Sequence, residues 1–231
     1  MPITVVGLDG DDTLWHNETR FDVTQGELRD LLRRHVPDAD VDAHLAETEM
    51  KNLGMYGYGV KAFTLSMIET AIEVTHGKIP ATDLQVILGW GKRMLMEPTE
   101  LLEGVEAALQ ELGKRYDLLL ITKGDLFDQE SKLARSGLAG LFLGVEIVSE
   151  KNVDSYRRIL ERRGIKPEEF LMVGNSPRSD IAPVLELGAW AVHIPYHLTW
   201  HHERVPEESL PREGWHRIDS ITELSRVLEK L

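Results

Sequence analysis

The sequence predicts an α/β fold, in which a parallel sheet with helices between its strands is interrupted once by an all-helical insertion. Two observations support this prediction. Short apolar runs alternate with segments of helical period through most of the chain. Between residues 14 and 96, in contrast, helical patterns follow one another and no convincing strand is found. The 231 residues are enough for one full α/β domain plus such an insertion.

Several apolar runs are predicted to be buried strands. They are Ile3–Leu8, Leu118–Ile121, Val145–Val148, Phe170–Val173 and Trp190–Ile194. Because most of these runs are continuously apolar, they are expected to be covered on both faces, as in a parallel sheet. The segments of helical period between them are Leu102–Leu112, Val153–Arg163 and Ser179–Leu187. This alternation favours βαβ units.

The insertion is predicted to span residues 15–96, between core segments 1–14 and 97–231. Its helical patterns are Gly26–His35, Val60–Thr75 and Thr82–Met96. Residues 52–59 are interpreted as a glycine-rich elbow, which is either a plain loop or a segment that faces an active site. A helical block in this position is interpreted as a cap.

The chain is acidic and contains no cysteine. Its 39 acidic and 26 basic residues give a net charge of −13, which repels nucleic acids and anionic membranes, so neither is expected as a partner. The lack of cysteine excludes disulfides, cysteine-ligated zinc and a cysteine nucleophile. Neither a signal-peptide pattern nor a long apolar run is visible, so we expect a soluble cytoplasmic protein.

The first predicted strand ends in an acidic motif. Asp9 and Asp11 are two residues apart, so both side chains can point to one side of the chain. Paired carboxylates suit a divalent cation, and they also suit a nucleophile and a proton donor. Gly10 allows the backbone to approach a ligand closely. The alternative is an acidic turn after the strand, in which Asp12 or Thr13 acts as a cap.

Polar residues also follow three later strands. Thr122 and Lys123 begin a segment that can cradle a phosphate, or Thr122 merely ends a strand. Lys151 can hold a phosphate and an aspartate together, or it can lie in solvent. Asn175 and Asp180 offer oxygens to a metal, with helix capping by neighbouring serines as the alternative. Since ligands bind at the carboxyl ends of strands in parallel sheets, the four clusters together favour a site.

The order of these motifs resembles that of the haloacid dehalogenase superfamily. The matching residues are Asp9-x-Asp11-x-Thr13, then Thr122, then Lys151, then Gly174-Asn-Ser-x-x-Ser-Asp180. The resemblance covers the whole chain, and the helical insertion falls at a common cap position of that superfamily. It implies a Rossmann-like core with the first strand in the centre of the sheet and an inserted all-helical cap domain.

The resemblance also implies a Mg²⁺-dependent phosphatase that hydrolyses small phosphate monoesters through an aspartyl-phosphate on Asp9. Asp11 would protonate the leaving oxygen and then help to activate water. The implied catalytic residues are Asp9, Asp11, Thr122 and Lys151. The implied substrate-binding residues are Gly10, Thr122, Lys123 and Lys151. The implied magnesium ligands are Asp9, the carbonyl of Asp11, Asn175 and Asp180.

Two alternatives stay open. A 2-haloacid dehalogenase-type hydrolase is disfavoured by Asp11, because dehalogenases of the superfamily lack an acid there. A weakly active protein that binds a phosphorylated ligand is suggested by Asn175, where the family pattern has an aspartate, so that the site loses one negative charge. The expected partner is a small phosphorylated metabolite, and the protein is expected to be a monomer or homodimer.

A histidine-rich segment follows the last predicted strand. His197, His201 and His202 could form a transition-metal site, but they lack regular ligand spacing, so a surface loop near the site entrance is favoured.

Overall fold

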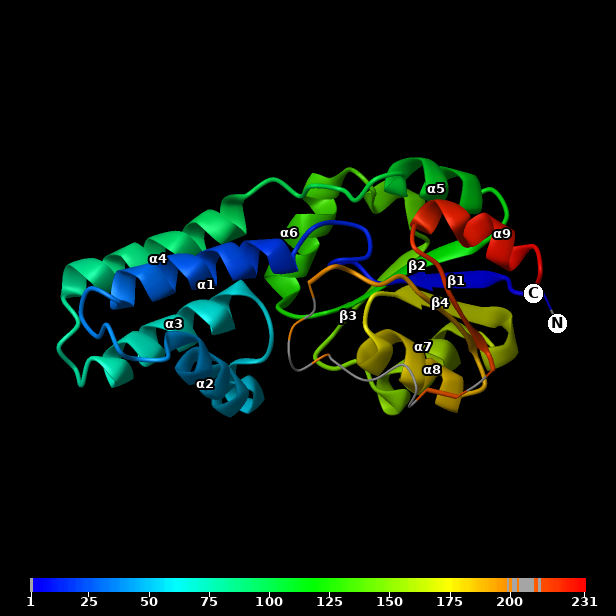
Figure 1. Cartoon of the computed structure of the whole chain (residues 1–231). Helices are drawn as coiled ribbons and strands as arrows, with labels where there is room; N and C mark the ends of the chain where they lie inside the picture. The colour runs from blue at the N-terminus through cyan, green and yellow to red at the C-terminus, as the bar shows by residue number, and fades with distance from the viewer. Residues whose placement is uncertain (1, 199, 201–202, 204–209, 212) are drawn as a thin grey trace. The chain divides into compact units, whose positions relative to one another are not determined.

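The computed structural model describes residues 2–198, 200, 203, 210–211 and 213–231 (Figure 1). The chain divides into two compact units, which are described separately. The core unit contains Met1–Glu18, Thr99–Lys123 and Gln129–Leu231. The helical unit contains Thr19–Pro98 and Gly124–Asp128. None of the helices in these described ranges is both long and apolar enough to cross a membrane.

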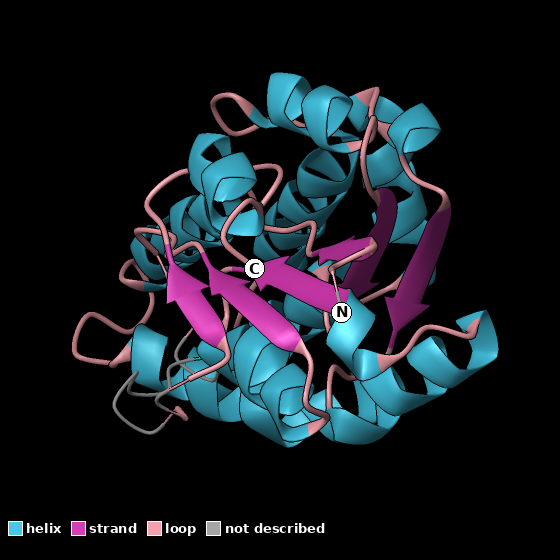
Figure 2. Ribbon diagram, turned by 90° about the vertical axis from the view of Figure 1, so that its right-hand side faces the viewer, coloured by secondary structure: helices cyan, strands magenta, loops and turns pink. Residues whose placement is uncertain are grey.

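The core unit is built on a six-stranded sheet with the order β3-β2-β1-β4-β5-β6. Its strands are β1 Val5–Leu8, β2 Asp117–Lys123, β3 Gly144–Val148, β4 Phe170–Gly174, β5 Trp190–His193 and β6 Trp215–Arg217. Every neighbouring pair is parallel. Figure 2 shows these strands with helices around them. The predicted parallel α/β sheet with a central first strand is therefore confirmed.

Alternate residues of β1 face two different apolar cores. Val6 and Leu8 belong to one buried cluster, and Val5 belongs to another on the opposite face. This double coverage explains why the strand has no polar alternation. Gly7 is required by packing, because a Cβ there would lie 2.6 Å from the Phe170 ring of β4.

The helices of the core unit mostly lie between these strands, and the last one follows β6. They are α5 Val105–Leu112, α6 Leu126–Ser136, α7 Val153–Arg163, α8 Ala182–Glu186 and α9 Leu224–Leu228, with Gln129 onwards of α6 assigned to this unit. Short 3₁₀ turns are found at Ala139–Leu141 and Pro167–Glu169 between strands, and at Ile221–Glu223 before α9. Helix α7 begins with a reciprocal cap, in which the Asn152 side chain accepts from Ser155 N at 2.9 Å and Asn152 N donates to Ser155 Oγ at 2.9 Å.

The predicted helix Ser179–Leu187 is replaced by two shorter pieces. A π-helical turn spans Pro177–Ile181, and α8 follows it. The reason is Pro183, which has no N–H to donate to the carbonyl of Ser179 four residues earlier. Tyr156 supplies the missing donor, because its buried hydroxyl lies 3.0 Å from Ser179 O.

The helical unit has four helices, α1 Glu18–Leu32, α2 Val41–Tyr56, α3 Val60–Val74 and α4 Ala81–Met96. Its core includes Leu28, Leu45, Met67 and Ile87, one from each helix. Helix α2 was not predicted, because half of its buried face is polar and the sequence shows little apolar periodicity there. The predicted elbow at residues 52–59 was too long. Helix α2 continues to Tyr56, and the turn is confined to residues 57–59.

Candidate active site

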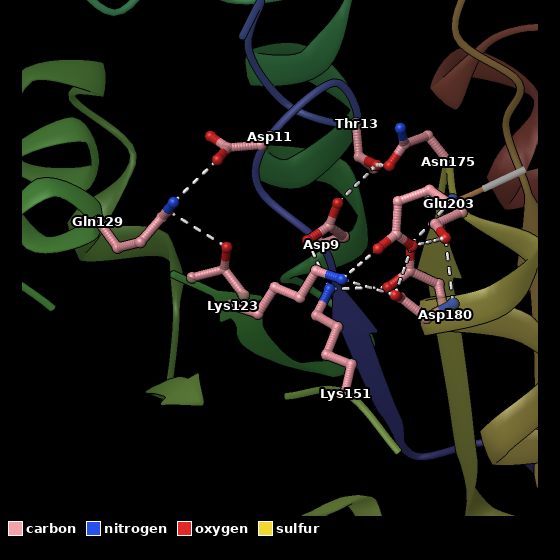
Figure 3. Close-up of polar contacts among 12 residues, drawn as sticks. Asp9, Asp11, Thr13, Lys123, Gln129, Lys151, Asn175, Asp180 and Glu203 are labelled. Carbon is pink, nitrogen blue, oxygen red and sulfur yellow. Dashed lines mark hydrogen bonds and ion pairs between the residues drawn. The ribbon is translucent and has the colours of Figure 1, made fainter. Parts of the chain in front are cut away.

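The polar clusters found in the sequence lie together at the carboxyl edge of the core sheet (Figure 3). Asp9 directly follows β1, and its backbone N–H donates to Val173 O of β4 at 2.9 Å. Thr122 lies near the end of β2, and Asn175 directly follows β4. Because β2, β1 and β4 are adjacent and parallel, their ends meet at one place.

A buried lysine joins two buried aspartates at this edge. Lys151 Nζ lies 2.5 Å from Asp9 Oδ1 and 2.7 Å from Asp180 Oδ1. Figure 3 shows the three side chains turned toward one another. Only 2% of the Lys151 side chain is exposed, so the alternative of a solvated loop lysine is excluded.

The cluster of Asp9, Lys151 and Asp180 has one ammonium for two carboxylates, so one negative charge is not balanced when both carboxylates are ionised. Burial raises the pKa of Asp9 to about 7, and Asp180 adds to this effect, while the Lys151 ammonium opposes it. Burial alone would lower the pKa of Lys151, but the neighbouring carboxylates of Asp180 and Asp9 outweigh it and raise that pKa. Lys151 is therefore positively charged, and a further cation would favour ionised Asp9.

The loop after β4 brings Asp180 back toward the strand end. Ser176 N donates to Asp180 Oδ2 at 3.0 Å. A Cβ on Gly174 would lie 2.2 Å from Asp180 Cγ, so a side chain at position 174 would displace this carboxylate. The loop thereby delivers one oxygen of Asp180 to Lys151 and fixes the other by a backbone N–H.

The hydroxyl of Thr13, a residue of the first motif, lies close to the fourth motif. It is 3.3 Å from Asp9 Oδ2 and 3.4 Å from Asn175 Oδ1. Oxygens of Asp9 and Asn175 therefore flank the same hydroxyl. Among the described residues, no group of three or more carboxylate or imidazole side chains could hold a metal. Two carboxylates, an amide oxygen and a backbone carbonyl nevertheless fit Mg²⁺, which typically takes one or two carboxylates and completes its octahedron with water and substrate oxygens.

A family model for haloacid dehalogenase-like hydrolases matches residues 3–188. The chain belongs to this family. A haloacid dehalogenase-like family hydrolase from Xanthomonas campestris has a similar structure, with a TM-score of 0.87 and 38% sequence identity over 99% of this chain and 92% of that one. The helical insertion and parallel core are thus shared with a family member of nearly the same length.

Curated relatives match over shorter stretches. N-acylneuraminate-9-phosphatase of Mus musculus is 30% identical over 57% of this chain and 53% of its own length. Glyceraldehyde 3-phosphate phosphatase of Methanothermobacter thermautotrophicus is 31% identical over 50% of this chain and 53% of its own length. The match spans about half the length of each of these relatives.

In this hydrolase, Asp11 lies beside Gln129, on the side of the site away from Lys151 (Figure 3). Trp15 Nε1 lies 2.6 Å from its Oδ1, and Gln129 Nε2 lies 2.8 Å from its Oδ2. Lys132 Nζ lies 3.0 Å from both oxygens. Burial alone would raise the pKa of Asp11, but the Lys132 ammonium and these hydrogen bonds lower it overall.

Lys123 forms a second ion pair, which is partly buried. Its ammonium contacts the carboxylate of Glu203 and lies 3.0 Å from Ser179 Oγ. The same carboxylate accepts from Ser176 Oγ at 2.5 Å and from Ser179 Oγ at 2.6 Å. Although burial alone would raise the pKa of Glu203, Lys123 and the two hydroxyls lower it to about 2. Lys123 therefore links β2 to the fourth motif.

Sequence reasoning missed three polar residues of this site, which are Gln129, Lys132 and Glu203. Gln129 and Lys132 are three residues apart, so they share one face of α6, and this spacing after the second motif was the available signal. Glu203 gave no signal, because its partner Lys123 lies 80 residues earlier.

The alternative role of the first motif as a capping turn is also realised. Asp12 accepts from Asn17 N at 2.9 Å and from Glu18 N at 3.0 Å, and so it caps the start of α1. Its left-handed φ of 61° is one that aspartate tolerates. The helix-capping residue Asp12 and the paired carboxylates of Asp9 and Asp11 therefore belong to the same turn.

The histidine-rich segment lies partly outside the described residues. His201 and His202 belong to the part that is not described. The described member, His197, stacks obliquely on Tyr196, with 4.3 Å between the ring centroids. The Tyr196 hydroxyl lies 2.6 Å from His16 Nδ1, just after the first motif.

Proposed function

We propose that this hydrolase is a Mg²⁺-dependent phosphatase, which cleaves small phosphate monoesters through an aspartyl-phosphate on Asp9. The observation that carries this proposal is the buried Asp9 carboxylate beside Lys151, with a second acid, Asp11, two residues on. Both curated relatives described above are phosphatases of phosphorylated small molecules, which supports the assignment. Asp11 disfavours a dehalogenase, because the family resemblance implies that dehalogenases lack an acid at this position.

In the first step, Asp9 attacks phosphorus and the bond between phosphorus and the ester oxygen breaks. The bonding electron pair goes to the leaving oxygen, which takes a proton from Asp11. Asp11 is ionised at rest, so it must first take up a proton. An approaching phosphate dianion favours this uptake, because a second negative charge raises the pKa of a neighbouring carboxyl group.

In the second step, water attacks phosphorus of the aspartyl-phosphate. Asp11 accepts the proton of this water, phosphate is formed, and Asp9 is released as a carboxylate. Both steps place negative charge close to Lys151, whose ammonium is buried and fixed. A fixed cation in a site of low dielectric stabilises such charge without reorganising.

We assign phosphate binding to Gly10, Thr122, Lys123 and Lys151. The Thr122 hydroxyl now donates to Gln129 Oε1 at 3.2 Å, so it must turn its hydrogen toward a phosphoryl oxygen when substrate binds. Lys123 is paired with Glu203, and its part is to shape the cradle and supply charge at its edge.

Asp9, Asp180, Asn175 and the carbonyl of Asp11 would hold Mg²⁺. The ion would supply positive charge to the phosphoryl oxygens. We further propose that residues 15–96 are a cap insertion that contributes to substrate selection, because substrate choice within one fold depends on such variable parts.

The proposal is tested by incubating the purified protein with Mg²⁺ and a panel of phosphate esters. The panel contains N-acylneuraminate 9-phosphate, glyceraldehyde 3-phosphate, other sugar phosphates, nucleotides and 4-nitrophenyl phosphate, with a 2-haloacid beside them. We expect phosphate release from at least one ester and no halide release. Halide release without phosphate release from any ester would sink the proposal.

Magnesium binding is expected to weaken as the pH falls below about 7. Because burial raises the pKa of Asp9 to about 7, a proton occupies this carboxyl group below that pH and must leave when the metal binds. The apparent dissociation constant should rise by up to about tenfold per pH unit below 7, and stay level above it. Calorimetric titration at several pH values measures this, and Asp9→Asn should abolish the dependence.

Replacing Asn175 with Asp is expected to tighten magnesium binding roughly two- to tenfold, because a carboxylate attracts the dication more strongly than an amide oxygen does. The gain is partial, since the new charge also repels Asp9. The maximal rate should change little or fall. Asn175→Leu, which has a similar shape but no ligand oxygen, should weaken binding. Position 175 is not a ligand if neither variant alters the Mg²⁺ requirement.

A further inference from the structure

Helix α6 carries two buried polar side chains that both bind Asp11. Gln129 and Lys132 are 2% and 5% exposed, respectively. Gln129 Nε2 lies 2.8 Å from one oxygen of Asp11, and Lys132 Nζ lies 3.0 Å from both. Neither residue belongs to the four motifs found in the sequence.

We infer that Gln129 and Lys132 are positioning residues for Asp11, which hold its carboxylate where the leaving group receives its proton. This inference rests on the proposed phosphatase function. It adds a second requirement to that function, namely that Asp11 acts only when helix α6 holds it in place.

The first argument is the double contact of Gln129. Its amide nitrogen donates to Asp11 at 2.8 Å (Figure 3). Its amide oxygen accepts from Thr122 Oγ1 at 3.2 Å. A single planar amide therefore spans the proposed proton donor and the proposed phosphate-binding hydroxyl. In the resting site this link sets the position of the acid relative to the phosphate cradle, and the bond from Gln129 Nε2 to Asp11 remains when the Thr122 hydroxyl turns toward substrate.

The second argument is the set of acceptors around Lys132. An ammonium group has three N–H donors. Both oxygens of Asp11 and Oδ1 of Asn17, at 2.7 Å, lie within hydrogen-bond distance of Lys132 Nζ. A buried ammonium is costly unless its geometry is well satisfied, and here that geometry also determines the orientation of the Asp11 carboxylate.

The expected effect depends on the leaving group. An alkoxide is a strong base and needs a proton as it departs, whereas 4-nitrophenolate leaves readily without one. If Lys132 and Gln129 act through Asp11, their loss should impair hydrolysis of an alkyl phosphate much more than hydrolysis of 4-nitrophenyl phosphate. A general disturbance of the site would impair both to the same extent.

The experiment compares kcat/KM for an alkyl phosphate and for 4-nitrophenyl phosphate in wild type, Lys132→Met, Gln129→Leu and Asp11→Asn. We expect Lys132→Met to lower the alkyl-to-aryl ratio at least about tenfold, in the same direction as Asp11→Asn. In the Asp11→Asn background, Lys132→Met should change the ratio less than about twofold, because both changes remove the same function. Lys114→Met removes an exposed lysine and should leave the ratio unchanged.

An equal loss for both esters in Lys132→Met, or additive losses in the double variant, would overturn the inference. If Lys132→Met does not fold, Gln129→Leu decides, because it removes the amide link without leaving a buried charge unpaired. If wild type releases phosphate from neither of these esters nor from any other ester of the panel, the proposed function fails. The crystal structure of Lys132→Met then decides the inference, which is overturned if Asp11 stays on Gln129 and Trp15 and supported if Asp11 moves.

Discussion

The Asp9→Asn variant should lose phosphatase activity by roughly 10⁴-fold or more, while it keeps its fold. An amide is a poor nucleophile toward phosphorus and cannot form the acyl phosphate. Asparagine has nearly the shape of aspartate, and Lys151 keeps its second carboxylate, Asp180, at 2.7 Å. The measurement is kcat/KM on the best ester of the panel, with circular dichroism and thermal unfolding to verify the fold.

Asp117→Asn is the matched control, since it makes the same chemical change on an exposed residue at the start of β2. It should keep wild-type activity. Beryllium fluoride with Mg²⁺ provides an independent check, because it mimics a phosphoryl group on a carboxylate. It should bind beside Asp9 in the wild type and not in Asp9→Asn. A folded Asp9→Asn variant with near-normal activity would show that Asp9 is not the nucleophile.

The centre of the sheet could be predicted because β1, β2 and β4 are buried on both faces and so read as continuous apolar runs. This signal is absent from elements whose buried residues are partly polar and from elements whose residues are mostly exposed. Helix α2 buries Thr48 and Asn52 beside Leu45, so its inner face is not apolar. Strand β6 has three residues and lies at the sheet edge, and two of them are exposed, which leaves no pattern to recognise.

In the candidate site, the residues of the short motifs could be predicted, but contacts between residues far apart in the sequence could not. Asp9, Asp11, Thr122 and Asp180 stand in short motifs at the carboxyl ends of strands or shortly after them, so their meeting follows from the parallel sheet. The environment of each group could not be predicted. The pKa of Asp11 is lowered by residues more than a hundred positions later, which only the packing of α6 against the first motif brings near.

Lys151→Met is expected to reduce activity by about 10²–10³-fold, because it removes the fixed charge that would stabilise the phosphoryl oxygens. It should also change the resting site. Without the ammonium, the pKa of Asp9 should rise further, since burial and the neighbouring Asp180 carboxylate both favour the protonated form. The pH at which the remaining activity of the variant reaches half of its maximum should therefore be higher than the corresponding pH for the wild type.

The free energy of unfolding provides a second test of the cluster formed by Asp9, Lys151 and Asp180. Removing one partner of a buried ion pair typically costs about 3–5 kcal/mol, but protonation of one carboxylate would relieve the repulsion between Asp9 and Asp180. Lys151→Met should thus be less stable than wild type at pH 8 and recover part of the difference at pH 6. Mg²⁺ should also recover part of it, because the dication can replace the lost charge between the carboxylates. Lys166→Met, which changes an exposed lysine, should show none of these effects. If Lys151→Met lost activity without any change in the pH dependence of activity or stability, the ammonium would not be the charge that balances Asp9.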